Sequence, residues 1–297
     1  MPYLGETAAL LTAGCWTFTT FLFSYAVRHV GSFRLNLLRM SFSAVILWVL
    51  VLGLWGTGWL RAALPREYGV LFASAWIGLT LGDWAYFQSL DMLGPRVGPL
   101  LVTLTPPIAA TLGALFLHEH PGPLGLLGMA MTLAGTAWVV LERSGSGAPR
   151  GHRIRGVTFG VLSSLATAVA YILSKIGMAG SINPLQASSL RMAAGTAAAW
   201  LFVAFGRRDT GLALLATNRR VLAAMIIGSI VGPVTGIWLS LVAIRHTQAG
   251  IATTLISLVP VLVLPVLAIR RQERLSWRAV GGALLAVAGV AVLFWRR

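Results

Sequence analysis

Residues 78–84 read GLTLGDW and residues 232–238 read GPVTGIW. Each stretch has two glycines four positions apart and a tryptophan two positions after the second glycine, and the two stretches are offset by 154 positions. The same offset pairs further residues along the chain: Pro106 with Pro260, Glu119 with Glu273, Gly128 with Gly282, and Gly135 with Gly289. The two stretches therefore indicate that the chain is an internal duplication.

A second alignment supports the duplication. With an offset of 152 positions, LLRMSFSAVILWVLV at 37–51 falls on SLRMAAGTAAAWLFV at 189–203, and Arg39 falls on Arg191. Between the copies lies RSGSGAPRGHR, a stretch rich in Gly, Ser and charge that is typical of a linker. We predict a first repeat over 1–142, a linker over 143–154 and a second repeat over 155–297.

The composition indicates a membrane protein. The 297 residues are 57% hydrophobic and 10% charged, whereas soluble domains are about 25% charged. Because a bilayer is spanned by about 20 apolar residues, the long apolar runs predict an all-α membrane protein with ten transmembrane helices. These runs lie at 4–27, 33–54, 68–90, 98–117, 123–141, 156–178, 185–205, 221–244, 249–269 and 278–295.

The charge and the N-terminus fit a multi-pass protein of the cell (inner) membrane. The net charge of +15 comes from Lys and Arg in loops and at span ends, so anionic lipid headgroups are the expected partner and nucleic acid is not. The opening residues MPYLGET lack a basic region and lead into a long span. We therefore expect the first span to be retained.

An odd number of spans per repeat has a topological consequence. Five spans make the second copy enter the membrane in the opposite sense, which gives inverted repeats. Inverted repeats are the architecture of alternating-access carriers, whose site lies between the halves. The side on which the termini lie stays open, because the Lys and Arg counts in the loops favour termini outside and the resemblance described next implies termini inside.

The chain resembles a ten-helix member of the drug/metabolite transporter superfamily, of the EamA type with two EamA repeats. Each half carries an arginine early in its second span, a central proline, and a glutamate followed by glycines nine and sixteen positions later. One departure is HEHPGP at 118–123, where a hydrophobic residue and threonine usually follow the glutamate. The resemblance implies a carrier, commonly an exporter, of amino acids, related metabolites or amphipathic compounds.

Asp83 is the acidic residue placed deepest in a predicted span. A central aspartate costs roughly 2.5 to 3.5 kcal/mol on insertion scales, so it is expected to face the bundle interior. It either binds a cation, an amine or a proton in a cavity, or forms a structural hydrogen bond to a neighbouring helix. On a helix, Thr80 and Tyr86 share its face.

Aromatic residues complete the predicted substrate-binding set. Trp84 and Trp238 are related by the repeat, Trp16 lies mid-span, and Tyr171 is the nearest counterpart of Trp16 in the sixth span. They line the solute pathway or contact lipid and core. With Asp83 and Tyr86, these residues form the predicted site between spans 1, 3 and 4 of the first half and 6, 8 and 9 of the second.

The basic residues inside spans have two interpretations. Arg39, Arg191 and Lys175 lie near span ends, where long side chains can reach the headgroups. The arginines alternatively form structural ion pairs or bind substrate, and Lys175 alternatively contacts an anion. Snorkelling is the simpler prediction for Lys175; for the arginines it is snorkelling or a structural pair.

Pro106 and Pro260 lie in the middle of predicted spans. Each removes a backbone N–H, so the carbonyls of Val102 and Ile256 lose their usual donors. In a membrane such groups are tolerated where other helices, side chains or cavity water satisfy them. We predict kinks that shape the cavity and either flex during gating or stay fixed.

Cofactor and metal chemistry are not indicated. In His118-Glu119-His120 the second histidine is two positions after the first, whereas a zincin motif needs four. The sequence has no glycine-rich phosphate loop and no nucleophile elbow. An intramembrane enzyme acting on an amphipathic or lipid-linked substrate remains the alternative, and it would need further ionisable groups beside Asp83.

Overall fold

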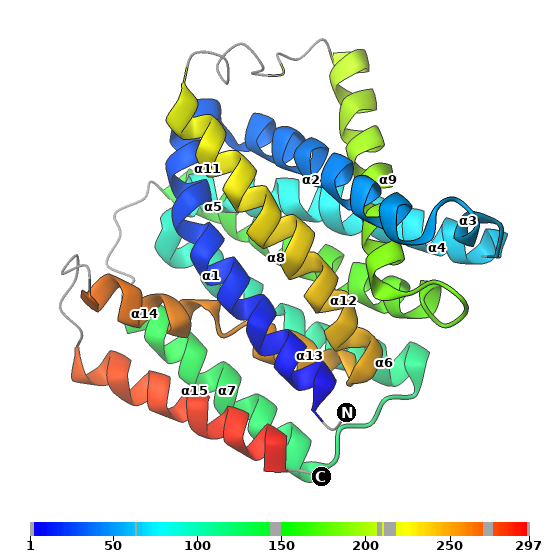
Figure 1. Ribbon diagram of the computed structural model, residues 1–297. Coiled ribbons are helices and arrows are strands. Elements are labelled where there is room, and N and C mark those ends of the chain that lie inside the picture. Colours follow the sequence, from blue (N-terminus) through cyan, green and yellow to red (C-terminus); the bar gives the residue numbers. More distant parts are fainter. Residues whose placement is uncertain are drawn as a thin grey trace.

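A computed structural model describes residues 3–62, 64–142, 150–206, 210, 218–269 and 276–295. These residues form helices joined by short turns, and they include no strand (Figure 1). Eight of their helices are long and apolar enough to cross a membrane, and two shorter apolar helices cover Thr105–Leu117 and Pro123–Val139. Most of the predicted linker, 143–149, and Glu273 lie outside the described residues.

The helices follow the predicted spans with two differences. In the first half they are α1 (Leu4–Val30), α2 (Ser32–Trp55), α3 (Trp59–Ala62), α4 (Pro65–Ala75), η1 (Trp76–Gly82), α5 (Asp83–Val102), α6 (Thr105–Leu117) and α7 (Pro123–Glu142). In the second half they are α8 (Arg150–Gly177), α9 (Pro184–Gly206), α11 (Arg219–Ser229), η2 (Ile230–Gly236), α12 (Ile237–His246), α13 (Ala249–Ile256), α14 (Val259–Ile269) and α15 (Trp277–Trp295).

The first difference concerns the boundary between the third and fourth predicted spans. We expected the chain to turn between residues 90 and 98, but α4, η1 and α5 run on without a break as far as Val102. The helix is interrupted only at 103–104. An apolar pattern predicts that a span exists better than it predicts where the span ends, because a helix can continue beyond the apolar stretch.

The second difference concerns the prolines. Pro106 is the second residue of α6 and Pro260 the second residue of α14. Each therefore lies in the first turn of a new helix, where a missing N–H is tolerated, and not inside a kinked one. The turns before these helices leave backbone carbonyl groups that need hydrogen-bond donors from elsewhere. In the first half, Leu101 O accepts hydrogen bonds from Leu104 N at 3.1 Å and from Ser164 Oγ of α8 at 2.7 Å.

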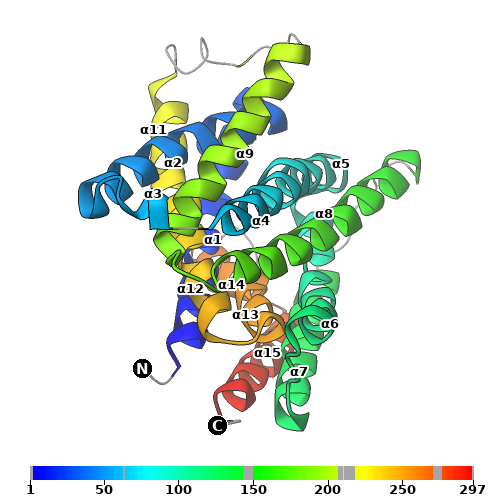
Figure 2. The same cartoon turned by 90° about the vertical axis from the view of Figure 1, so that its right-hand side faces the viewer.

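The two halves pack on each other in a symmetric pattern. The first helix of each half contacts the third and fourth spans of the other: α1 packs on α11, η2, α12 and α13, and α8 packs on α4, η1, α5 and α6. The second helices, α2 and α9, pack together, as do the fifth, α7 and α15. Figures 1 and 2 show α7 beside α15, and the two chain ends near each other.

Glycines allow the fifth helices to approach closely. A Cβ atom at Gly128 would lie 2.9 Å from Gly289 O, and one at Gly282 would lie 3.0 Å from Gly135 O. The glycines that carry the family resemblance therefore form the contact between α7 and α15. Small residues at such a crossing let two backbones meet within the membrane.

The glycines around 78–84 and 232–238 likewise allow close helix packing, here between the two halves. Gly78 and Gly82 of η1 face Ala170 and Ala166 of α8. Gly228, Gly232 and Gly236, at the end of α11 and in η2, face residues of α1: Phe23, Thr19, Trp16 and Cys15. These glycines therefore form packing surfaces between the two halves.

Candidate functional site

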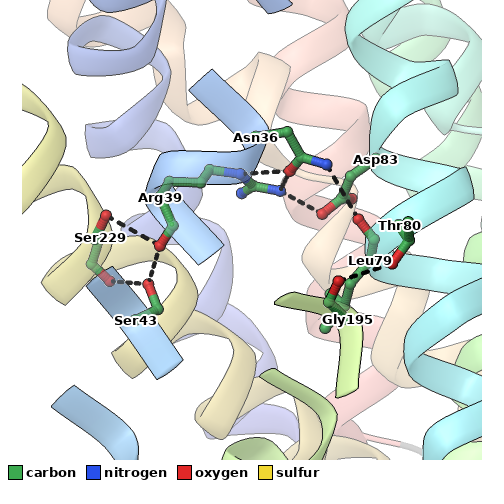
Figure 3. A network of polar contacts seen from close by, with 8 residues as sticks. All are labelled: Asn36, Arg39, Ser43, Leu79, Thr80, Asp83, Gly195 and Ser229. Carbon is green, nitrogen blue, oxygen red and sulfur yellow. Dashed lines mark hydrogen bonds and ion pairs between the residues drawn. The ribbon is translucent and has the colours of Figure 1, made fainter. Parts of the chain in front are cut away.

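Asp83 forms an ion pair with Arg39, which joins the start of α5 to α2 (Figure 3). The pair links Asp83 Oδ2 to Arg39 Nη2. The Arg39 side chain is 4% exposed and that of Asp83 is 28% exposed. The snorkelling interpretation of Arg39 is therefore wrong and its structural ion pair is confirmed, while part of the Asp83 carboxyl group remains accessible.

Asn36 holds the pair in place. Its Oδ1 accepts from Arg39 Nε at 3.0 Å and from Nη2 at 2.8 Å, and its Nδ2 donates to Leu79 O at 3.2 Å. Leu79 belongs to η1, the turn just before Asp83, so one amide positions both the guanidinium group and the segment that presents the carboxylate (Figure 3). Asn36 was not among the predicted site residues, although an asparagine one turn before an arginine in an apolar span was a usable signal.

Two phenylalanines cover the Arg39 guanidinium group. Its Cζ lies 5.8 Å from the ring centroid of Phe23 in α1 and 5.2 Å from that of Phe87 in α5. Cation–π contacts of this kind partly replace the water that a buried guanidinium loses. Arg39 thus has a carboxylate, an amide and two aromatic faces as partners.

Hydrogen bonds between halves surround this pair. Ser229 Oγ of α11 donates to Arg39 O at 3.4 Å, and Thr80 Oγ1 of η1 donates to Gly195 O of α9 at 3.2 Å. Figure 3 shows both bonds beside the ion pair. The pair therefore sits where elements of both repeats meet.

Both halves contain a π-helical turn at the same repeat position. η1 covers Trp76–Gly82 and η2 covers Ile230–Gly236, an offset of 154 positions. In η1 the N–H of Asp83 bonds to Gly78 O, five residues back. Such turns change the direction of the side chains that follow and are frequent at functional sites. The apolar periodicity did not predict them.

The tyrosines of the predicted set lie within electrostatic reach of the pair. Asp83 interacts with Tyr86 in α5 and with Tyr171 in α8. The structure therefore groups Asp83, Tyr86 and Tyr171 of the predicted site.

The tryptophans of the predicted set lie elsewhere. Trp16 packs between α1 and η2, where a Cβ at Gly232 would lie 3.3 Å from its ring. Trp84 and Trp238 are each 37% exposed. Trp84 lies edge-to-face with Phe159 at 5.3 Å and lines an open pocket of about 510 Å³ between α5 and α8.

A second polar cluster connects the halves near the start of α1. We call Glu6, Glu119, Lys175, Thr247 and Ala249 the end cluster. Lys175 Nζ lies 2.5 Å from Glu119 Oε1 and donates to Thr247 O at 2.7 Å. Glu119 Oε2 accepts from Ala249 N at 2.7 Å, and Glu6 Oε1 accepts from Thr247 Oγ1 at 3.1 Å. Lys175 therefore contacts a carboxylate of the chain and does not extend to headgroups.

The histidines beside Glu119 do not gather around a common point. His118 ends α6 with a left-handed backbone, φ 53°, and Glu119 turns toward Lys175. Within the described ranges, no group of three or more His, Cys, Asp or Glu side chains could hold a metal ion.

Long apolar helices, two repeats that pack symmetrically and a buried ion pair beside their contact define a multi-pass membrane protein. The sequence profile described as "EamA-like transporter family" matches residues 3–141 and again residues 154–295. The chain belongs to the EamA-like transporter family, and it is a membrane transporter of the drug/metabolite type.

A solved structure shares the fold. A protein titled only "Crystal structure of protein" superimposes with a TM-score of 0.79 at 19% sequence identity, and the match covers 98% of this chain and 96% of the other. No curated protein matches the sequence. At this identity the likeness shows the fold alone.

Proposed function

We propose that the protein is a secondary carrier that moves a small organic solute across the cell (inner) membrane by alternating access between two inverted halves, 1–142 and 155–297. We propose amino acids or related metabolites as the solutes and export as the direction of transport. The carrier needs no cofactor and has the solute and the bilayer as its partners. The exact count of ten spans and their inverted orientation belong to this proposal.

The observation that carries the proposal is the symmetric packing of the halves. Each half places its first helix against the third and fourth spans of the other half. Two equivalent bundles that meet along equivalent faces can open on one side while they close on the other. The glycine faces of η1 and η2 lie on these contacts and let the two halves approach each other closely.

The interrupted helices support the same function. The breaks at 103–104 and 257–258 occupy matching places in the two repeats. Discontinuous helices with free backbone groups are how many carriers build a solute site. We place the site where Asp83, Tyr86 and Tyr171 meet, with Trp16, Trp84 and Trp238 at its margins and Pro106 and Pro260 beside the breaks.

The alternative of an intramembrane enzyme gains no support from this site. Such an enzyme needs several ionisable groups free to act at one depth. The Asp83 carboxylate is paired with Arg39. The arrangement favours binding over chemistry.

Solute flux across a liposome membrane tests the proposed carrier function. Purified protein is reconstituted in liposomes loaded with labelled amino acids and related metabolites, and release is compared with protein-free liposomes. We expect saturable release of at least one solute, and no release of any solute in the panel would contradict the carrier function.

The role of Asp83 is tested in the same assay. Release by Asp83→Asn is compared with that of the wild type across pH. Loss of flux or of its pH dependence places Asp83 in the mechanism, and full retention of both removes it.

A further inference from the structure

Arg191 of α9 is a buried arginine at the repeat position of Arg39. It is 2% exposed. Its Nε and Nη1 atoms have no hydrogen-bond partner within the described part of the chain. Arg191 is too buried to snorkel, so that interpretation is wrong for this residue as well.

Its counterpart in the first half shows what is missing. Arg39 is bound by Asp83 and Asn36. In the second half, Ile237 occupies the repeat position of Asp83 and Ser188 that of Asn36. Ile237 cannot pair with a cation, and Ser188 Oγ donates to Pro184 O at 2.8 Å. The second half thus has the arginine without residues equivalent to its two partners.

The surroundings of Arg191 place it beside the proposed site. A Cβ atom at Gly78 of η1 would lie 3.5 Å from Arg191 Nη2. Arg191 interacts electrostatically with Tyr171 and Asp83. Asp83 is already paired with Arg39, so the region carries two guanidinium groups and one carboxylate.

A buried, unpaired guanidinium is costly unless an anion reaches it. Its planar donors match the two oxygens of a carboxylate, which makes arginine the usual residue for binding that group. We propose that Arg191 binds a carboxylate of the transported solute. The substrate is therefore a carboxylic acid in its ionised form, and its acid group lies between α9, η1 and α8. That this carboxylate belongs to a transported solute rests on the proposed carrier function, whereas the binding of a carboxylate at Arg191 does not.

Matched probes test the proposal without transport. The melting temperature of the purified protein in an uncharged detergent is measured at constant ionic strength with sodium benzoate or benzamide, and with sodium acetate or acetamide. Each pair has a similar shape and differs in charge. We expect the melting temperature to rise with carboxylate concentration and not with the amides. Equal shifts within each pair, or no shift with either carboxylate, would overturn the proposal.

Variants assign the effect to Arg191. Arg191→Gln is expected to lose the carboxylate response, and Arg191→Lys to keep a smaller one because it retains the charge. Arg220→Gln, which removes an exposed arginine at the start of α11, is expected to respond as the wild type does. A carboxylate response that persists in Arg191→Gln would show that the binding site is elsewhere.

One variant remains informative if Arg191→Gln does not fold. Ile237→Asp returns to the second half the carboxylate that the first half has, and Ile237 belongs to the same apolar cluster as Met192, the neighbour of Arg191. We expect Ile237→Asp to fold and to lose the benzoate response, because its own carboxylate occupies Arg191. Ile237→Asn is the matched control and is expected to keep the response. If Ile237→Asp binds benzoate as well as the wild type does, the proposal fails.

Failure of carboxylate binding at Arg191 can be distinguished from failure of the carrier function. Benzoate binding that depends on Arg191 in a protein without flux would leave this site intact and end the carrier function. Flux without any carboxylate response would support the carrier function and contradict carboxylate binding at Arg191. An equal rise with sodium chloride alone would show an inorganic anion site and overturn the carboxylate assignment.

Discussion

Lys175 of the second half pairs with Glu119 of the first half, with Nζ 2.5 Å from Oε1. Both side chains are mostly buried, at 22% and 12% exposure. The pair lies in the end cluster, which also includes the start of α1 through Glu6. In an alternating-access cycle a contact of this kind between halves must form and break, so the end cluster is the expected closure on one side of the membrane.

Removing one partner of this ion pair should lower the free energy of unfolding more than removing both partners. Lys175→Met leaves the Glu119 carboxylate without its cation, and we expect a loss of about 1 to 3 kcal/mol in the free energy of unfolding, between the values for exposed and buried pairs. Adding Glu119→Gln should restore part of the loss. Unfolding by denaturant in detergent measures both, and strictly additive losses would contradict coupling between the two side chains.

The Asp83–Arg39 pair should respond in the same way and more strongly. Asp83→Leu leaves a guanidinium of 4% exposure without a carboxylate, and removal of one partner of a buried pair costs about 3 to 5 kcal/mol. Adding Arg39→Met should recover at least half of this. The measurement is again unfolding in detergent, and an Asp83→Leu variant as stable as the wild type would show that the pair contributes nothing.

The glycine crossing gives a prediction with a control on the same helix. A Cβ at Gly289 would lie 2.5 Å from Thr132 N and 2.7 Å from Gly128 O, whereas one at Gly281 would meet nothing within 4 Å. We expect Gly289→Ala to cost about 1 to 3 kcal/mol through overpacking and Gly281→Ala to be neutral or stabilising by up to about 1 kcal/mol. Equal effects in thermal unfolding would mean that α7 and α15 separate easily.

A single substitution can lock the two halves together. A Cβ at Gly236 would lie 3.4 Å from Cys15 Cβ, near the separation that a disulfide requires. Oxidised Gly236→Cys should form the bond between α1 and η2, and we expect flux in liposomes to stop and to return after reduction. Gly236→Cys with Cys15→Ser is the control, and undiminished flux in the cross-linked protein would show that this face stays fixed during transport.

The position of Pro260 predicts a mild effect of its removal on stability. Because it lies in the first turn of α14, its missing N–H costs no helical hydrogen bond, and Pro260→Ala should change the free energy of unfolding by less than about 1 kcal/mol. A proline inside a helix would behave differently, since its removal would add a bond and relieve a clash. A gain of about 3 kcal/mol in denaturant unfolding would contradict the break at 257–258.

The fold could be predicted from the sequence because its signals are local and repeated. Apolar length identifies a helix without knowledge of its neighbours, and the doubled glycines and arginines disclosed the duplication. The end of the third span could not be predicted in this way, since the chain stays helical through the polar residues around Asp91. The π-helical turns were also missed, because one extra residue in a turn scarcely alters an apolar pattern.

The candidate site was predicted less well, because it depends on which side chains meet. Asp83 was singled out correctly as a residue that faces the interior, and a structural ion pair was one of the two predictions for Arg39, but nothing in the sequence joined these residues, which lie 44 positions apart. The end of a predicted span was a poor guide to depth, since Arg39 is covered by Phe23 of α1 and Phe87 of α5 and Arg191 lies against Gly78 of η1. Only the packing of the helices reveals that burial.

The crossing of α7 and α15 limits how the molecule can change shape. Where backbones touch at glycines, a shift along either axis by one residue would drive Leu293 or Val139 into the opposite main chain, since both already border the glycines. Rotation about the contact meets no such obstacle. We expect this edge to serve as a pivot of nearly fixed position, so that displacements grow with distance from it and are largest at α2 and α9.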